Sequence, residues 1–137
     1  MPCPKLSNPI NPTAEDLRLW AYTPDADYPD EMSQDWDLCV TSFERAPLLV
    51  QFASDPDCPN RKFLLSCLYI LAGDSVRDPD DRSDVPRIQE ILRLVAPDAP
   101  PDVLRWVQRT ERLLARPETY DYNRWGWGYF AYDDSTD

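Results

Sequence analysis

The feature that most constrains the fold of this sequence is an apolar run from Phe63 to Gly73. The run does not alternate between apolar and polar residues, and Ile70 is its only β-branched member, which disfavours a buried strand. Four side chains recur at the i, i+3, i+4 and i+7 spacing of one helix face: Leu64, Cys67, Leu68 and Leu71. The pattern predicts a buried central helix over about residues 60–73.

Capping and turn residues mark both ends of this predicted helix. Either Asp57 or Asn60 can cap its amino end, and Pro59 suits a first turn. Gly73 is expected to end it, because glycine readily adopts the left-handed conformation that follows many helices. The run is shorter than the roughly 20 apolar residues that cross a bilayer, so we expect no membrane association.

Capping residues, prolines and apolar spacing predict further short helices on both sides of the central one. They are expected to begin near Thr13, Ser33, Pro47, Ser83 and Asp102. Residues 1–12 contain four prolines and are predicted to form an extended arm. The prediction is therefore an all-α fold, a compact bundle of five or six short helices in a single domain spanning residues 1–137.

The last 20 residues, 118–137, form a segment rich in aromatic residues, predicted to pack on the bundle. Its aromatic residues are Tyr120, Tyr122, Trp125, Trp127, Tyr129, Phe130 and Tyr132. A soluble domain rarely exposes that much apolar surface, so we expect Trp125 and Phe130 to be buried and Tyr122 or Tyr129 to be partly exposed. The alternation from Trp125 to Tyr129 also allows a short extended segment.

Two absences narrow the possible functions. The sequence has no histidine, which excludes histidine-based catalytic triads and histidine metal ligands. It has three glycines, none in a phosphate-binding loop, and four cysteines without a paired metal-ligand spacing. We therefore predict no cofactor, no metal site and no catalytic residues.

The acidic residues are concentrated in the first half of the chain and suggest a basic partner. Residues 1–60 contain 11 acids and 3 bases, whereas residues 61–137 contain 14 acids and 11 bases. With a net charge of −11, the protein is expected to repel nucleic acid and to attract a basic protein. The predicted partner-binding residues are Asp25, Asp27, Asp30, Glu31, Asp35, Tyr122, Trp127 and Tyr129.

These patterns favour a non-enzymatic module that binds a basic, toxin-like protein, as an acidic inhibitor or immunity protein does. One alternative is an enzyme or small-ligand binder with a pocket between the aromatic tail and an arginine face formed by Arg105, Arg109 and Arg112. A structural subunit of a larger assembly is another. We also expect a monomer or weak homo-oligomer. The absence of a hydrophobic signal segment predicts a cytoplasmic location. The predominance of arginine over lysine suggests a GC-rich and therefore bacterial genome.

Overall fold

The computed structural model describes residues 3–125, and within that range the chain is helical and has no strand. The predicted all-α class is therefore confirmed. The elements are α1 (Ala14–Ala21), η1 (Asp30–Met32), α2 (Trp36–Val40), α3 (Ala46–Ala53), α4 (Arg61–Val76), α5 (Val85–Leu92), α6 (Pro101–Ala115), η2 (Pro117–Thr119) and α7 (Tyr122–Trp125). The predicted extended segment and Trp127, Tyr129 and Phe130 lie outside the described residues.

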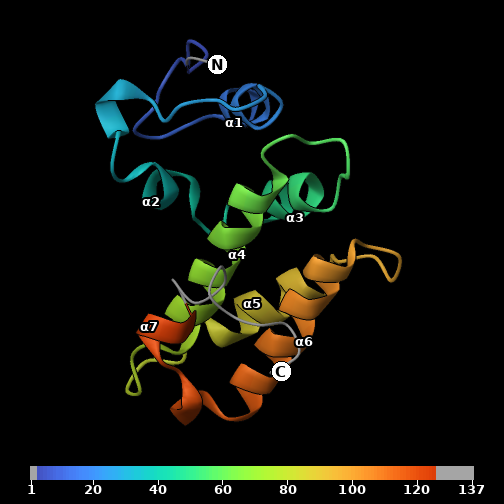
Figure 1. The fold of residues 1–137 in the computed structure, drawn as a ribbon. Helices are drawn as coiled ribbons and strands as arrows, with labels where there is room; N and C mark the ends of the chain where they lie inside the picture. Colours follow the sequence, from blue (N-terminus) through green and yellow to red (C-terminus); the bar gives the residue numbers. More distant parts are fainter. Residues whose placement is uncertain (1–2, 126–137) are drawn as a thin grey trace.

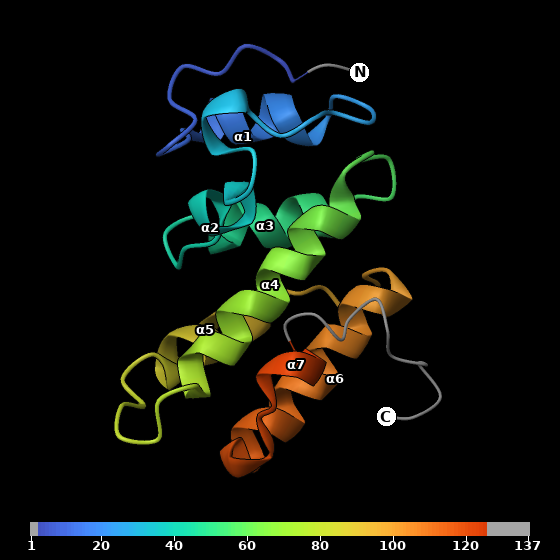
Figure 2. The same ribbon diagram turned by 60° about the vertical axis from the view of Figure 1, so that its left-hand side comes forward.

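The long helix α4 is the centre of the bundle, as its apolar run predicts. Figures 1 and 2 show α1, α2 and α3 gathered at its amino-terminal end, α5 and α7 near its carboxy-terminal end, and α6 running alongside it. Leu64, Leu65 and Leu68 are fully buried on it. Because α4 contacts helices at both ends, it joins two groups of short helices into one core.

Gly73 does not end this helix, contrary to the prediction. The helix continues to Val76, and Gly73 is buried within it. A Cβ atom at this position would lie 2.8 Å from Cδ1 of Trp125 and 2.9 Å from Cε1 of Tyr120. Glycine is needed here because the aromatic segment after α6 packs directly against the helix backbone.

The amino end of α4 is attached to α1 through Asn60. Asn60 occupies the N-cap position, but its side chain makes no capping hydrogen bond. Its amide nitrogen instead donates to the carbonyl oxygens of Trp20 (2.9 Å) and Thr23 (2.7 Å) at the end of α1. The residue predicted as a cap therefore joins two helices.

The proline-rich arm is fixed to the start of α1 by one buried carboxylate. Asp16 accepts hydrogen bonds from the backbone and hydroxyl of Ser7, the backbone of Asn8 and the backbone of Thr13. The Thr13 hydroxyl accepts from the Asp16 backbone at 3.1 Å, which completes a capping box at the helix start predicted near Thr13. These bonds lower the pKa of Asp16 to about 2, although burial opposes the shift.

Candidate functional site: an acidic cleft

The loop between α1 and α2 is held in place by aromatic packing and one hydrogen bond. The indole nitrogen of Trp20 donates to the carbonyl oxygen of Asp27 at 2.9 Å. The next side chain, Tyr28, packs against Trp20 and Phe63 with ring centroids 6.3 Å and 5.6 Å away. Since Asp16 fixes the arm on the same side of α1, the arm and the loop face each other.

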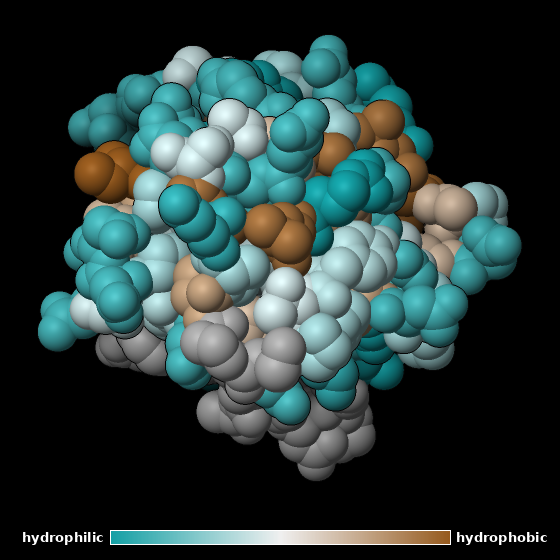
Figure 3. Space-filling view, turned by 90° about the horizontal axis from the view of Figure 1, so that it is seen from above, coloured by the Kyte–Doolittle hydropathy of each residue, from teal (hydrophilic) through white to brown (hydrophobic). Residues whose placement is uncertain are grey.

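A cleft of about 430 Å³ lies between the arm and the loop. Its walls are formed by Cys3, Pro4, Lys5, Leu6 and Pro9 from the arm and by Asp27, Tyr28, Pro29, Asp30 and Glu31 from the loop. The three acidic side chains are exposed, and Lys5 is the single base among the described lining residues. We call this feature the acidic cleft. Figure 3 shows the molecule from above, with a few hydrophobic side chains on a largely hydrophilic surface.

The negative charge of the acidic cleft affects the thiol of Cys3. Its pKa is raised, first by burial and then by the negative charges of Glu31, Asp30 and Asp27. Each of these effects disfavours the thiolate. Cys3 is therefore a poor nucleophile, and the acidic cleft repels anions rather than activating a thiol.

The structure brings together three of the eight predicted partner-binding residues: Asp27, Asp30 and Glu31 line the acidic cleft. Asp25 lies at the preceding turn with a φ of 53°, and Asp35 is the N-cap of α2. Neither lines the cleft. Tyr122 is 51% exposed in α7, near the opposite end of α4 (Figures 1 and 2). Trp127 and Tyr129 lie outside the described residues.

Sequence reasoning missed the contribution of Tyr28 and of the arm. Tyr28 is the one aromatic residue in the acidic stretch 24–32, and such an isolated ring was a usable signal of an anchored loop. The part played by Cys3, Lys5 and Leu6 had no local signal. It depends on the return of the arm to Asp16, whose side-chain carboxylate accepts hydrogen bonds from the backbone of Ser7 and Asn8.

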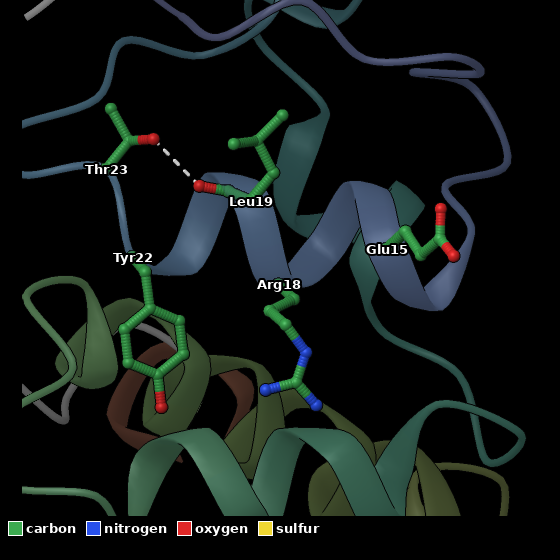
Figure 4. Close-up of a pocket in the computed structure, with 5 residues that line it drawn as sticks. All are labelled: Glu15, Arg18, Leu19, Tyr22 and Thr23. Carbon is green, nitrogen blue, oxygen red and sulfur yellow. Dashed lines mark hydrogen bonds between the residues drawn. The ribbon is translucent and has the colours of Figure 1, made fainter.

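A second hollow, of about 490 Å³, lies beside α1 (Figure 4). The Arg18 and Tyr22 side chains point from α1 toward α3, whereas Leu19 and Thr23 lie on the other side of α1. The Tyr22 hydroxyl donates to Asp55, which raises the pKa of Tyr22 to about 12, and the Arg18 guanidinium lies 5.1 Å from the Phe52 ring. Although this hollow is larger than the acidic cleft, Arg18, Tyr22 and Thr23 in its lining already have internal partners. Glu15 is its single acidic lining residue within residues 3–125.

The arginine face predicted on α6 is not a continuous surface. Arg109 is 5% exposed and donates to the Tyr69 hydroxyl at 3.1 Å, whereas Arg112 is exposed. The groove between α5 and α6 has a volume of about 540 Å³, and Arg93 and Glu111 are its charged lining residues. Trp127 and Tyr129, which the predicted pocket between these arginines and the tail aromatics would need, lie outside the described residues, so that pocket stays a prediction.

The described part of the aromatic segment packs onto α4. Trp125 is 9% exposed, and its indole nitrogen donates to the Tyr69 carbonyl oxygen at 2.6 Å. The Tyr122 ring lies under the Arg77 guanidinium at 5.6 Å. Tyr122 is thus the most accessible of the aromatic side chains that the structure describes in this segment. Trp125 is part of the hydrophobic core.

Residues 3–125 contain no group of three metal-ligating side chains arranged to hold an ion. None of the helices in that range is both long and apolar enough to cross a membrane. No protein-family model, curated protein or solved structure matches this chain.

Proposed function

We propose that this protein is a non-enzymatic binding module that uses the acidic cleft to bind a basic protein, as an acidic inhibitor or immunity protein would. The observation that supports this proposal best is the convergence of Asp27, Asp30 and Glu31 on one cleft. These carboxylates come from a loop that is itself held in place by Trp20 and Phe63. A positioned set of negative charges gives a basic partner both attraction and orientation.

The carboxylates of the acidic cleft differ from three partnered acids of the same chain, and they share their lack of partners within residues 3–125 with exposed acids such as Asp57, Asp80 and Asp98. Asp16 and Asp55 accept hydrogen bonds from internal donors, and so does Asp81 in the loop before α5. Within residues 3–125, none of the three cleft carboxylates accepts a hydrogen bond or forms an ion pair. Their negative charge therefore has no structural role in this range and is available to a partner.

The sign of the charge selects the class of partner. A chain with a net charge of −11 repels phosphate backbones and anionic lipid surfaces. A basic protein segment, in contrast, gains both long-range steering and short-range ion pairs at the acidic cleft. The proposed partner is therefore a basic protein.

The test uses two triple variants with the same change in net charge. The cleft variant is Asp27→Asn, Asp30→Asn, Glu31→Gln, and the control variant is Asp57→Asn, Asp80→Asn, Asp98→Asn, whose exposed acids do not line the cleft. Wild-type and control proteins immobilised at about 0.15 M salt should capture the same dominant basic protein from the native host, and the cleft variant should lose it. Equal capture by all three proteins would contradict the proposal.

A further inference from the structure

Tyr28 adds a partly exposed aromatic ring to the charged side chains of the acidic cleft. The side chain is 41% exposed and lines the cleft beside Asp27 and Asp30. Behind it, Phe63 packs at 61° with ring centroids 5.6 Å apart, and Trp20 packs at 52°. The ring is therefore fixed before any partner arrives, while part of it remains accessible from the cleft.

A fixed aromatic ring among carboxylates discriminates between the two basic side chains. The guanidinium of arginine is planar, so it can stack on the ring while its N–H groups pair with a carboxylate. The ammonium of lysine is a compact and strongly hydrated charge, and it gains less from the ring. Carboxylates attract both side chains and can themselves favour arginine through bidentate pairing, so the contribution of the ring is the part of the preference that is lost when the ring is removed.

The same chain already combines arginine with aromatic rings at three places. Guanidinium groups lie 4.4–5.6 Å from ring centroids in the pairs Arg87–Phe43, Arg18–Phe52 and Arg77–Tyr122. In contrast to those rings, Tyr28 has no arginine from within residues 3–125 over it. The apolar cleft residues Pro4, Leu6 and Pro9 also provide surface for the methylene groups of an incoming arginine.

We propose that Tyr28 makes the acidic cleft selective for arginine over lysine in the basic partner segment. This inference rests on the proposed function, because it specifies the side chain that the acidic cleft receives. Tyr28 is the residue that sets specificity, and Asp27, Asp30 and Glu31 supply the attraction.

The probes are two end-blocked peptides, one of four arginines and one of four lysines, titrated into the full-length protein at fixed low ionic strength. We expect the arginine peptide to bind about two- to fivefold more tightly, the ratio typical of an exposed cation–π contact. Tyr28→Leu should reduce that preference, and Tyr28→Phe should keep it. Tyr122→Leu, which removes an exposed ring outside the acidic cleft, should leave the preference unchanged.

Equal affinity for the two peptides in the wild-type protein, or a preference as large in Tyr28→Leu as in the wild type, would overturn the arginine inference. A second readout does not depend on the folding of that variant: the Tyr28 ring resonances of the wild-type protein should shift more with the arginine peptide than with the lysine peptide. Equal shifts would overturn it too.

Failure of the proposed function gives a different result. In that case neither peptide binds, or the cleft variant Asp27→Asn, Asp30→Asn, Glu31→Gln binds both as tightly as the wild-type protein does. Binding that the cleft variant loses, without any preference for arginine, removes the inference about Tyr28 and leaves the proposed function in place.

Discussion

The two ends of the bundle use their conspicuous residues differently. At the carboxy-terminal end of α4, Trp125 packs over Gly73 and Arg109 is buried against Tyr69. At the amino-terminal end, Asp16 also has hydrogen-bond partners within the protein, but Asp27, Asp30 and Glu31 remain exposed in the acidic cleft. An unusual composition therefore indicates a binding site only where the fold has not already given those side chains partners.

The two ends are also held together by different forces. Around α1, polar side chains bind backbone groups of distant segments, as Asp16, Asn60 and Arg45 do. At the other end, close packing at Gly73 predominates. A paired Arg61–Asp102 salt bridge joins the starts of α4 and α6, at the amino-terminal end of α4. We therefore expect low pH to destabilise the amino-terminal end first. Substitutions that change side-chain volume should destabilise the carboxy-terminal end.

The largest expected loss of stability comes from a substitution in α4, the helix that connects the two ends of the bundle. Leu68 is fully buried, so Leu68→Ala should lower the free energy of unfolding by about 2–5 kcal/mol. Leu38 is 61% exposed, and Leu38→Ala should change it by less than about 0.5 kcal/mol. Urea unfolding of both variants measures the difference. A loss below about 1 kcal/mol for Leu68→Ala would mean that α4 is not the centre of the core.

Asp16 tests the polar attachment of the amino-terminal end. Its buried carboxylate accepts hydrogen bonds from three residues, so Asp16→Ala should cost about 1.5–3 kcal/mol of unfolding free energy. The pKa is lowered from 3.8 in the unfolded chain to about 2 in the folded protein. The contribution of Asp16 is therefore complete above about pH 4 and is lost as the pH falls toward 2.

Unfolding of wild type and Asp16→Ala at pH 6 and pH 2.5 checks this dependence. The difference in unfolding free energy between the two proteins should shrink at the lower pH. A difference that is the same at both values would show that Asp16 acts through packing rather than through its charge.

Gly73 tests the close packing at the other end. In Gly73→Ala the new Cβ meets the Trp125 and Tyr120 rings at less than 3.0 Å, and we expect a loss of about 1–3 kcal/mol. In a Trp125→Ala background the same change should cost less than about 1 kcal/mol, because the larger ring is gone and alanine favours the helix. Thermal unfolding of the wild type, the two single variants and the double variant gives the coupling free energy between Gly73 and Trp125. A coupling near zero would contradict the contact between these two residues.

The smallest expected effect is on stability at the acidic cleft. Since Asp27, Asp30 and Glu31 have no hydrogen-bond or ion-pair partner within residues 3–125, Asp27→Asn, Asp30→Asn, Glu31→Gln should change the free energy of unfolding by less than about 0.5 kcal/mol. Chemical unfolding checks this. A loss above about 1.5 kcal/mol would assign these acids a structural role like that of Asp16.

Local patterns predicted the helices of this fold well where neighbouring residues decide the outcome. The Thr13–Asp16 capping box and the apolar stripe of α4 are set by spacing within one helix. The extension of α4 through Gly73 was not predictable in this way, because the rings that require glycine lie about 50 residues further along the chain. The burial of Arg109 depends in the same way on Tyr69 of another helix.

The acidic cleft itself was not predictable from the sequence, for the same reason. The acidity of residues 24–35 is visible in the sequence, and the structure places Asp27, Asp30 and Glu31 on one wall of the cleft, whereas their role in binding a partner stays a prediction. The opposite wall was not visible, because Cys3 and Lys5 reach it only through the contacts of Ser7 and Asn8 with Asp16. Such side-chain-to-backbone contacts have no periodic signature.

The central claim, that the acidic cleft is the contact surface for a basic partner, is tested most directly by the salt dependence of binding to the captured protein. For the wild type and the Asp57, Asp80 and Asp98 control variant, affinity should fall steeply and equally between about 0.05 and 0.3 M salt, as exposed charges are screened. The Asp27, Asp30 and Glu31 variant should bind weakly with a much flatter dependence. Matching curves for the two variants would contradict the claim, because binding would then follow net charge alone.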